Sequence, residues 1–168
     1  SDGNNTFALN LYQALKDSEG NLFYSPYSIS SALAMTYAGA RGETEKRMAE
    51  TLNFTLPQDS LHPAFNSVSL ALASRGQETE DQGKMGFILK NVNAIWGQKN
   101  EKFLPDFLDV LSENYGAGMR ILDFAREPDK SRLTINNWIS EQTANKIQEL
   151  LPDGSIDTGT FLVLTNAI

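Results

Sequence analysis

The stretch that decides the fold is Asn21–Arg41, which reads NLFYSPYSISSALAMTYAGAR. Its apolar run at 22–24 has the length and aromatic content of a buried strand. Ser25 is a preferred helix N-cap residue. Pro26 suits the first helical position, because its missing N–H group would have no partner there. Apolar residues then recur at helical spacing until Gly39, where a helix is expected to stop. The stretch therefore predicts a core strand followed by a helix that is apolar over most of its circumference.

The composition limits the classes of function. The 168 residues, of which 40% are hydrophobic, suit one ordinary domain with a sizeable core. A net charge of -7 and dispersed basic residues argue against a nucleic-acid partner. No apolar run approaches the ~18 residues of a membrane span, so no membrane partner is expected. No signal peptide leads the sequence, although one could have been removed.

The sequence lacks the residue patterns of an enzyme. It has no cysteine and one histidine, His62, which excludes thiolate catalysis, disulfides and two-histidine metal sites within the chain. His62 precedes Pro63, has no nucleophile elbow near it, and is interpreted as a surface residue at the start of a helix. The glycines at 39–42 and 116–118 match no phosphate-binding loop. We therefore expect no enzymatic activity, no metal and no cofactor.

Hydrophobic periodicity predicts an α+β fold. Helices are expected at about 6–16, 26–38, 44–52, 61–74, 104–114 and 129–141, strands at 87–97, 119–124 and 160–168, and a polar loop at 75–84. The strand at 160–168 reads as buried on both faces, yet three strands offer it too few neighbours. With no repeat and no linker, residues 1–168 are predicted to be part of one larger fold.

Several segments together resemble the serpins, the serine protease inhibitor family. They are Asn21–Met35 with residues 39–44, FLPDF at 103–107, YGA at 115–117, INNW at 135–138, Thr143 with Lys146-Ile147, and LVLTNAI at 162–168. The resemblance covers essentially the whole chain and is closest in layout to ovalbumin-like and microbial serpins. It implies the N-terminal part of the serpin fold: helices A to F, strands 1, 2 and 3 of the large sheet A, and one strand of sheet B.

The resemblance also implies a function. Serpins trap a serine protease that cleaves their reactive-centre loop, because the cut loop then inserts into sheet A as a new strand. The reactive-centre loop and the C-terminal strands lie outside this chain. The expected partners are therefore a serine protease, reached through that loop, and the remaining C-terminal part. A non-inhibitory serpin, acting as a carrier, chaperone or storage protein, is the alternative. The location is expected to be extracellular, with a cytoplasmic one also compatible.

Four residues take on a conformational role through this resemblance. Ser25, Pro26, Ser28 and Asn166 match the serpin shutter, a region beneath the part of sheet A that opens. An amide such as Asn166 in an apolar strand must in any case find partners or cost ~1–3 kcal/mol. Alternatively, Ser25 is only an N-cap and Ser28 bonds a helical carbonyl.

A second group belongs to helix F, which lies over sheet A in serpins: Asn136, Trp138 and Thr143. Trp138 and Trp96 are interpreted as packing residues. Asn145 replaces a glycine common in the family, and asparagine tolerates the positive φ that such a turn requires. The glycosylation sequons at Asn4 and Asn53 are interpreted as chance matches.

Overall fold

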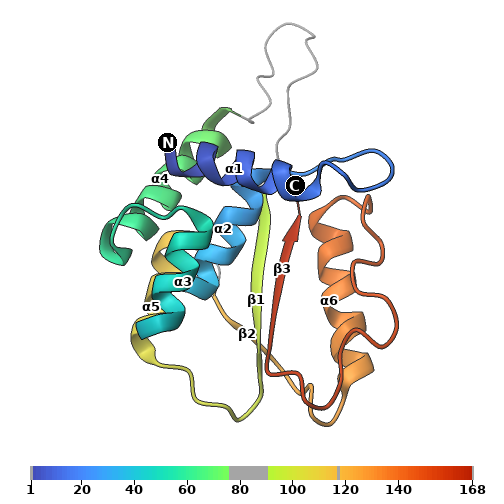
Figure 1. The fold of residues 1–168 in the computed structure, drawn as a ribbon. Coiled ribbons are helices and arrows are strands. Elements are labelled where there is room, and N and C mark those ends of the chain that lie inside the picture. The colour runs from blue at the N-terminus through green and yellow to red at the C-terminus, as the bar shows by residue number, and fades with distance from the viewer. Residues whose placement is uncertain (1, 76–90, 117, 168) are drawn as a thin grey trace, which may run out of the picture.

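The computed structural model describes residues 2–75, 91–116 and 118–167. These residues form six helices and three strands, which confirms the α+β prediction (Figure 1). In chain order they are α1 (Asp2–Leu15), α2 (Pro26–Tyr37), α3 (Gly42–Leu52), α4 (Gln58–Arg75), β1 (Val92–Gln98), α5 (Pro105–Tyr115), β2 (Arg120–Leu122), α6 (Pro128–Gln142) and β3 (Leu162–Ala167). The polar loop at 76–84 and the beginning of the strand predicted at 87–97 lie outside the described residues.

Helix α2 begins as its sequence predicts. Ser25 is the N-cap, and its side chain accepts a hydrogen bond from the backbone N–H of Ser28 at 3.3 Å. Pro26 follows at the first helical position. The helix ends at Tyr37, two residues before Gly39. The local signals at Ser25 and Pro26 therefore suffice to fix the start of the central helix.

The sheet has the strand order β2-β1-β3. Strand β1 runs parallel to β2 and antiparallel to β3. The antiparallel register places Asn93 opposite Asn166 and Trp96 opposite Val163. Among the described residues, no strand pairs with the other edge of β3.

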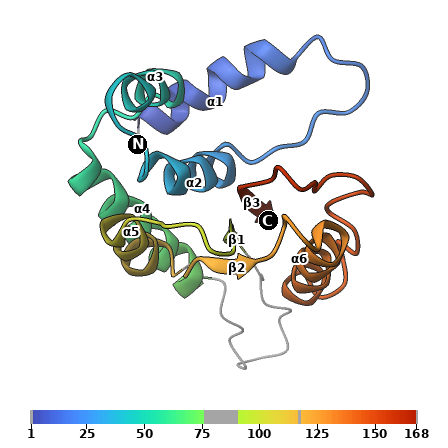
Figure 2. The same ribbon diagram turned by 90° about the horizontal axis from the view of Figure 1, so that it is seen from below.

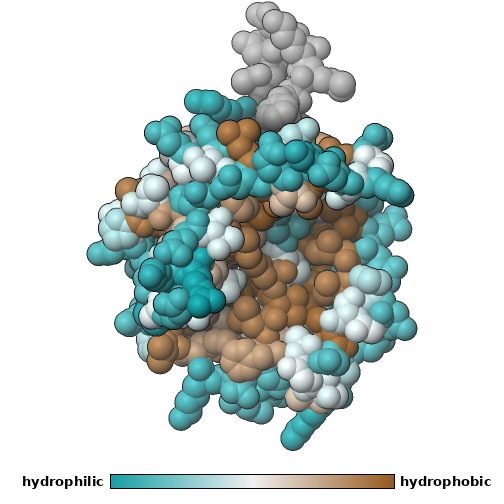
Figure 3. Space-filling model, viewed as in Figure 1, coloured by the Kyte–Doolittle hydropathy of each residue, from teal (hydrophilic) through white to brown (hydrophobic). Residues whose placement is uncertain are grey.

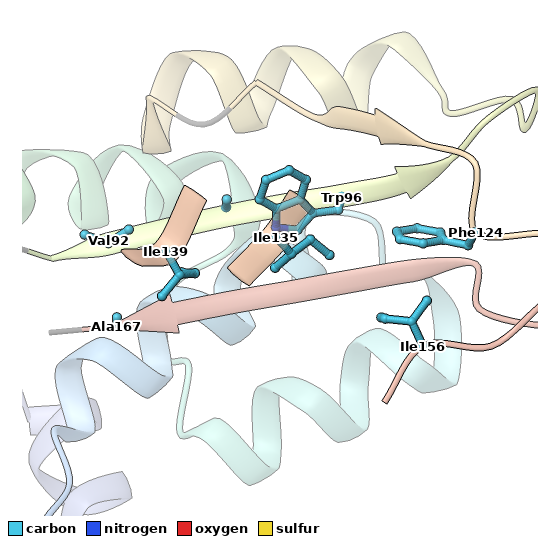
Figure 4. Close-up of a cluster of buried hydrophobic side chains, with 8 residues drawn as sticks. Val92, Trp96, Phe124, Ile135, Ile139, Ile156 and Ala167 are labelled. Carbon is cyan, nitrogen blue, oxygen red and sulfur yellow. The ribbon is translucent and has the colours of Figure 1, made fainter. Parts of the chain in front are cut away.

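Helices cover both faces of this sheet (Figure 2). On one face, alternate residues of β1 pack against Ile135 and Ile139 of α6 (Figure 4). On the other face, Ile95 packs with Met35 of α2 and Leu111 of α5, and all three side chains are fully buried. The period-2 alternation of β1 thus divides its side chains between two cores.

Two predictions about strands need correction. The run at 22–24 forms no strand, and Phe23 is 91% exposed. Its backbone has no neighbouring strand among the described residues, and a strand needs one to pair its N–H and C=O groups. Strand β3 is only partly covered: Thr165 and Ala167 are buried, whereas residues 162–164 are half-buried. An edge strand has neighbours on one side only, so fewer side chains cover it.

Candidate functional site

A chain of polar side chains connects α2 to the sheet. The Ser28 hydroxyl donates a hydrogen bond to Asn166 Oδ1 at 2.8 Å. The Asn166 amide donates to Asn93 Oδ1 at 2.6 Å, and the Asn93 amide donates to Asn91 Oδ1 at 3.3 Å. We call Ser28, Asn91, Asn93 and Asn166 the serine–asparagine cluster.

The fold explains why these residues meet. Asn93 and Asn166 are directly opposed in the antiparallel register and share the sheet face that carries Ile95 and Leu164. Ser28 lies in the first turn of α2, which covers that face, and is 1% exposed. A buried hydroxyl without a partner is costly, so the 2.8 Å bond to Asn166 stabilises this packing.

The four residues predicted for the shutter divide into two pairs. Ser28 and Asn166 are brought together by their hydrogen bond. Ser25 and Pro26 instead begin the helix, so the N-cap interpretation of Ser25 is confirmed. Sequence reasoning missed Asn93, although the argument applied to Asn166, an amide in an apolar strand, would have identified it. The shutter role of all four residues stays a prediction.

On the opposite face of the sheet, Trp138 holds α6 against β1. Its ring meets that of Trp96 edge-on, with centroids 5.4 Å apart. The Arg120 guanidinium carbon lies 4.9 Å from the Trp138 centroid and 5.4 Å from the Trp96 centroid, within cation–π range. Trp96 also donates its indole N–H to Thr165 on β3 at 3.1 Å. Both tryptophans are therefore packing residues, as predicted.

Asn136 makes no hydrogen bond to the serine–asparagine cluster; it binds the segment of chain that returns from α6. Asn136 is 4% exposed, and its Oδ1 accepts from the backbone N–H groups of Leu150 at 3.1 Å and Leu151 at 2.9 Å. Its Nδ2 donates to the carbonyl of Leu151 at 2.9 Å. One buried amide thus fixes this return segment, residues 143–157, against α6.

Thr143 ends α6 and begins the return segment. Its hydroxyl donates to the Ile139 carbonyl at 2.8 Å and accepts from the Ile147 N–H at 3.2 Å. The next two residues have positive φ, 50° at Ala144 and 62° at Asn145. Asn145 thus adopts the positive φ that asparagine tolerates better than most residues. The three helix F residues serve different contacts: Trp138 holds the helix on the sheet, while Asn136 and Thr143 hold the return segment on the helix.

His62 is not the surface residue that the sequence predicted. It is 2% exposed, and its Nδ1 lies 2.7 Å from the Tyr115 hydroxyl. Helix α4 begins at Gln58, one turn before the expected start, and His62 faces Tyr115 and Tyr37 in the core. Burial, followed by the positive charge of Arg41, lowers the pKa of His62 to about 4. His62 is therefore a neutral core residue at pH 7.

The described residues 2–75, 91–116 and 118–167 contain no group of three or more His, Asp or Glu side chains that could hold a metal ion. Within the same ranges, no helix combines the length and apolar character needed to cross a bilayer.

The family model described as "Serpin (serine protease inhibitor)" matches residues 2–168. The chain belongs to the serpin family. Its sequence is 43% identical over 170 residues to the leukocyte elastase inhibitor of Sus scrofa and 40% identical to that of Homo sapiens. Each match covers all of this chain but only 43% and 42% of the relative. The chain thus spans less than half the length of these relatives.

Solved structures agree with this assignment. Arabidopsis AtSerpin1 in its native stressed conformation matches 97% of the chain and 41% of that structure, with a TM-score of 0.80 and 27% identity. Ovalbumin from the emu, Dromaius novaehollandiae, matches 98% of the chain and 44% of that structure, with a TM-score of 0.83 and 24% identity, a likeness of fold. The three strands, in the order β2-β1-β3, are those expected as strands 1, 2 and 3 of sheet A.

The comparisons bear on two further expectations. Serpins are protease inhibitors, so the prediction that this chain is not an enzyme is confirmed. The comparisons do not support the extracellular location expected from the sequence.

Proposed function

We propose that the protein containing this chain inhibits a serine protease by trapping it, and that this chain supplies the sheet and the shutter. The reactive-centre loop would come from the remaining C-terminal part, which these 168 residues do not include. Two relatives whose names describe elastase inhibition support an elastase-type target. The observation that carries the proposal is the edge of β3 with which no strand among the described residues pairs.

An unpaired strand edge is a template for another strand. Strand β3 pairs with β1 on one side only, as far as the described residues extend. A loop segment inserted beside β3 would form backbone hydrogen bonds, each contributing ~0.5–1.5 kcal/mol, and would cover half-buried side chains at 162–164. This gain supports a sheet that becomes more stable when it accepts a strand.

Within this proposal, the serine–asparagine cluster acts as the shutter. Ser28 and Asn166 join the helix layer to β3, the strand beside the proposed opening. When β3 moves, short hydroxyl and amide groups can exchange hydrogen-bond partners without a large change in packing, which aliphatic side chains cannot do. Ser25 and Pro26 contribute by fixing where α2 begins, and hence where Ser28 lies.

Inhibition is tested by incubating the complete protein with an elastase-type protease, and in parallel with trypsin-like and chymotrypsin-like proteases. We expect an SDS-stable covalent complex with at least one of them. Cleavage of the reactive loop without any such complex would contradict the proposal and indicate a non-inhibitory serpin.

The shutter role is tested by Asn166→Leu and Ser28→Leu in the complete protein. Both should change the rate of conversion to the latent or polymeric form, because each removes the bond between α2 and β3. Asn137→Leu is a matched control, since Asn137 is exposed on α6. Unchanged thermal stability and unchanged inhibition in both cluster variants would refute the shutter role, whatever the result of the inhibition assay.

A further inference from the structure

A cavity of about 830 Å³ lies between α1, α2, α4 and the connection from α3 to α4. Figure 2 shows these helices grouped on the side of the molecule away from α6. The volume falls in the ~300–1,000 Å³ range of small-molecule sites. The cavity does not reach the serine–asparagine cluster or the free edge of β3, and protease inhibition gives it no role.

Most of the wall is apolar. Helix α4 contributes Leu61, Phe65, Val68 and Leu72, and Phe54 lies opposite in the connection. Val68, in the middle of this lining, remains 45% exposed. An amphipathic helix normally buries its apolar stripe, so the cavity leaves apolar surface available to a ligand.

Unpaired polar atoms lie in the same wall. Ser30 is 1% exposed, and its Oγ has no hydrogen-bond partner among the described residues. The Oδ1 atom of Asn4 is also buried without a partner there. A third lining residue, Tyr27, makes no hydrogen bond of ordinary geometry through its hydroxyl, although the Ser69 side chain lies close to it. Buried polar atoms are paired in the great majority of cases, and here the unpaired ones line one cavity.

The charges around the cavity restrict the ligand. Asp2 is the only ionisable carboxylate in the described lining, and no lysine or arginine lines it. The carboxylate of Asp2 would therefore repel a ligand that carries a carboxylate or phosphate group, and no basic side chain in the described lining would neutralise the charge of that ligand. Asn4 Oδ1 can only accept a hydrogen bond, so the ligand must donate one.

From these features we propose that the cavity binds a neutral, largely apolar small molecule with an O–H or N–H donor at one end. The apolar body lies along α4, and the donor end meets Asn4 and Ser30. Ser25, the N-cap of α2, also lines this cavity, but the serine–asparagine cluster does not, and ligand binding here does not depend on the proposed inhibition.

The probe for this test is N-phenyl-1-naphthylamine, a neutral aromatic amine whose fluorescence rises in apolar surroundings, titrated into the complete protein. We expect saturable binding that Ala64→Leu weakens about tenfold, because the added atoms occupy the cavity. Ala71→Leu, an exposed position on the same helix, is the matched control and should leave the affinity unchanged. Absence of saturable binding, or equal binding by the Ala64→Leu and Ala71→Leu variants, would overturn the site.

The polar end is tested by Ser30→Ala, which removes a hydroxyl without adding volume and is expected to fold. It should weaken probe binding about fivefold, while Ser31→Ala, a buried neighbour outside the cavity, should not. Octanol should displace the probe and octanoate should not. Unchanged affinity in Ser30→Ala, or equal displacement by both competitors, would overturn the proposed ligand chemistry.

Discussion

His62 illustrates how one buried side chain can make stability depend on pH. The imidazole lies against Tyr115 in a core that also contains Tyr37, whose ring centroid is 6.2 Å away. Burial disfavours the charged form of both partners. It lowers the pKa of His62 to about 4 and raises that of Tyr115. The pair is therefore neutral in the folded protein over the physiological range.

We expect stability to fall as the pH is lowered from 6.5 towards 4. The unfolded chain protonates its histidine near pH 6.5, whereas the folded chain resists protonation until about pH 4. The unfolded state thus binds more protons between these values, so the contribution of His62 is complete above pH 6.5 and is lost below it, by at most about 3 kcal/mol. Urea unfolding at several pH values measures this loss. His62→Gln should flatten the slope, and identical slopes in both proteins would contradict the assignment.

Ala144 carries backbone strain that glycine would relieve. An alanine at φ 50° places its Cβ close to the following carbonyl oxygen. We expect Ala144→Gly to raise the free energy of unfolding by about 1 kcal/mol, measured by urea unfolding. Ala73→Gly, within helix α4, should lower it by about as much. A destabilised Ala144→Gly variant would show that the turn depends on the methyl group instead.

At the scale of elements, α6 and its return segment form one unit. Besides Asn136, the nine-tenths buried side chain of Arg132 joins them: it donates to Asp129 at 2.8 Å, to Glu149 at 3.2 Å and to the Leu151 carbonyl at 3.2 Å. The bond to Asp129 is the main reason that the pKa of Arg132 is raised. The return segment contains little regular structure, so these side chains replace the hydrogen bonds that a helix or strand would provide.

Asn136→Ala should release this segment. The variant loses three hydrogen bonds and leaves the half-buried backbone N–H groups of Leu150 and Leu151 without their side-chain acceptor, at a cost of about 2–3 kcal/mol. Hydrogen exchange at the amides of residues 150 and 151 should accelerate with little change in β1. Asn137→Ala, an exposed neighbour, is the control. Unchanged exchange at both amides would show that Arg132 alone suffices.

At the scale of the whole molecule, apolar surface lies beside the edge of β3 that no described strand pairs. Figure 3 shows hydrophobic side chains gathered over the middle of the face on which β3 lies in Figure 1. Phe161, just before β3, is 50% exposed. Exposed apolar surface of this extent is typical of a site that contacts another polypeptide segment.

Coupling between the helix layer and the sheet can be measured directly in the complete protein. Ser28→Ala and Asn166→Ala should show a coupling energy of about 0.5–1.5 kcal/mol in a double-mutant cycle, since they share one hydrogen bond. Ser28→Ala combined with Thr143→Ala, on the opposite face of the sheet, should be additive within ~0.5 kcal/mol. Additivity in both cycles would show that the bond does not connect the two layers energetically.

The sequence predicted the elements better than their contacts. Helix α2 and the turn at Asn145 follow from local chemistry, an N-cap with proline and a tolerated positive φ. Burial of His62 and exposure of Phe23 could not be foreseen, because each depends on which distant segment lies alongside. Within the candidate site, Ser28 and Asn166 were identified. Asn93 was missed although it too is an amide in an apolar strand; only its pairing with Asn166 depends on the register of β1 and β3.

By itself, then, the sequence determined that this is an α+β chain organised around Ser25–Tyr37, with the ordered motifs of a serpin. Local preferences and hydrophobic periodicity depend on residues that are close together in the chain, so they can be recognised from the sequence. Only the tertiary structure decided that Ser28 contacts Asn166 and that His62 is neutral. It also decided that Trp138 packs on the sheet while Asn136 and Thr143 bind the return segment, and that a cavity lies beneath α1. Each of these features depends on contacts between side chains that are far apart in the sequence. Tertiary packing, rather than local propensity, determines such contacts.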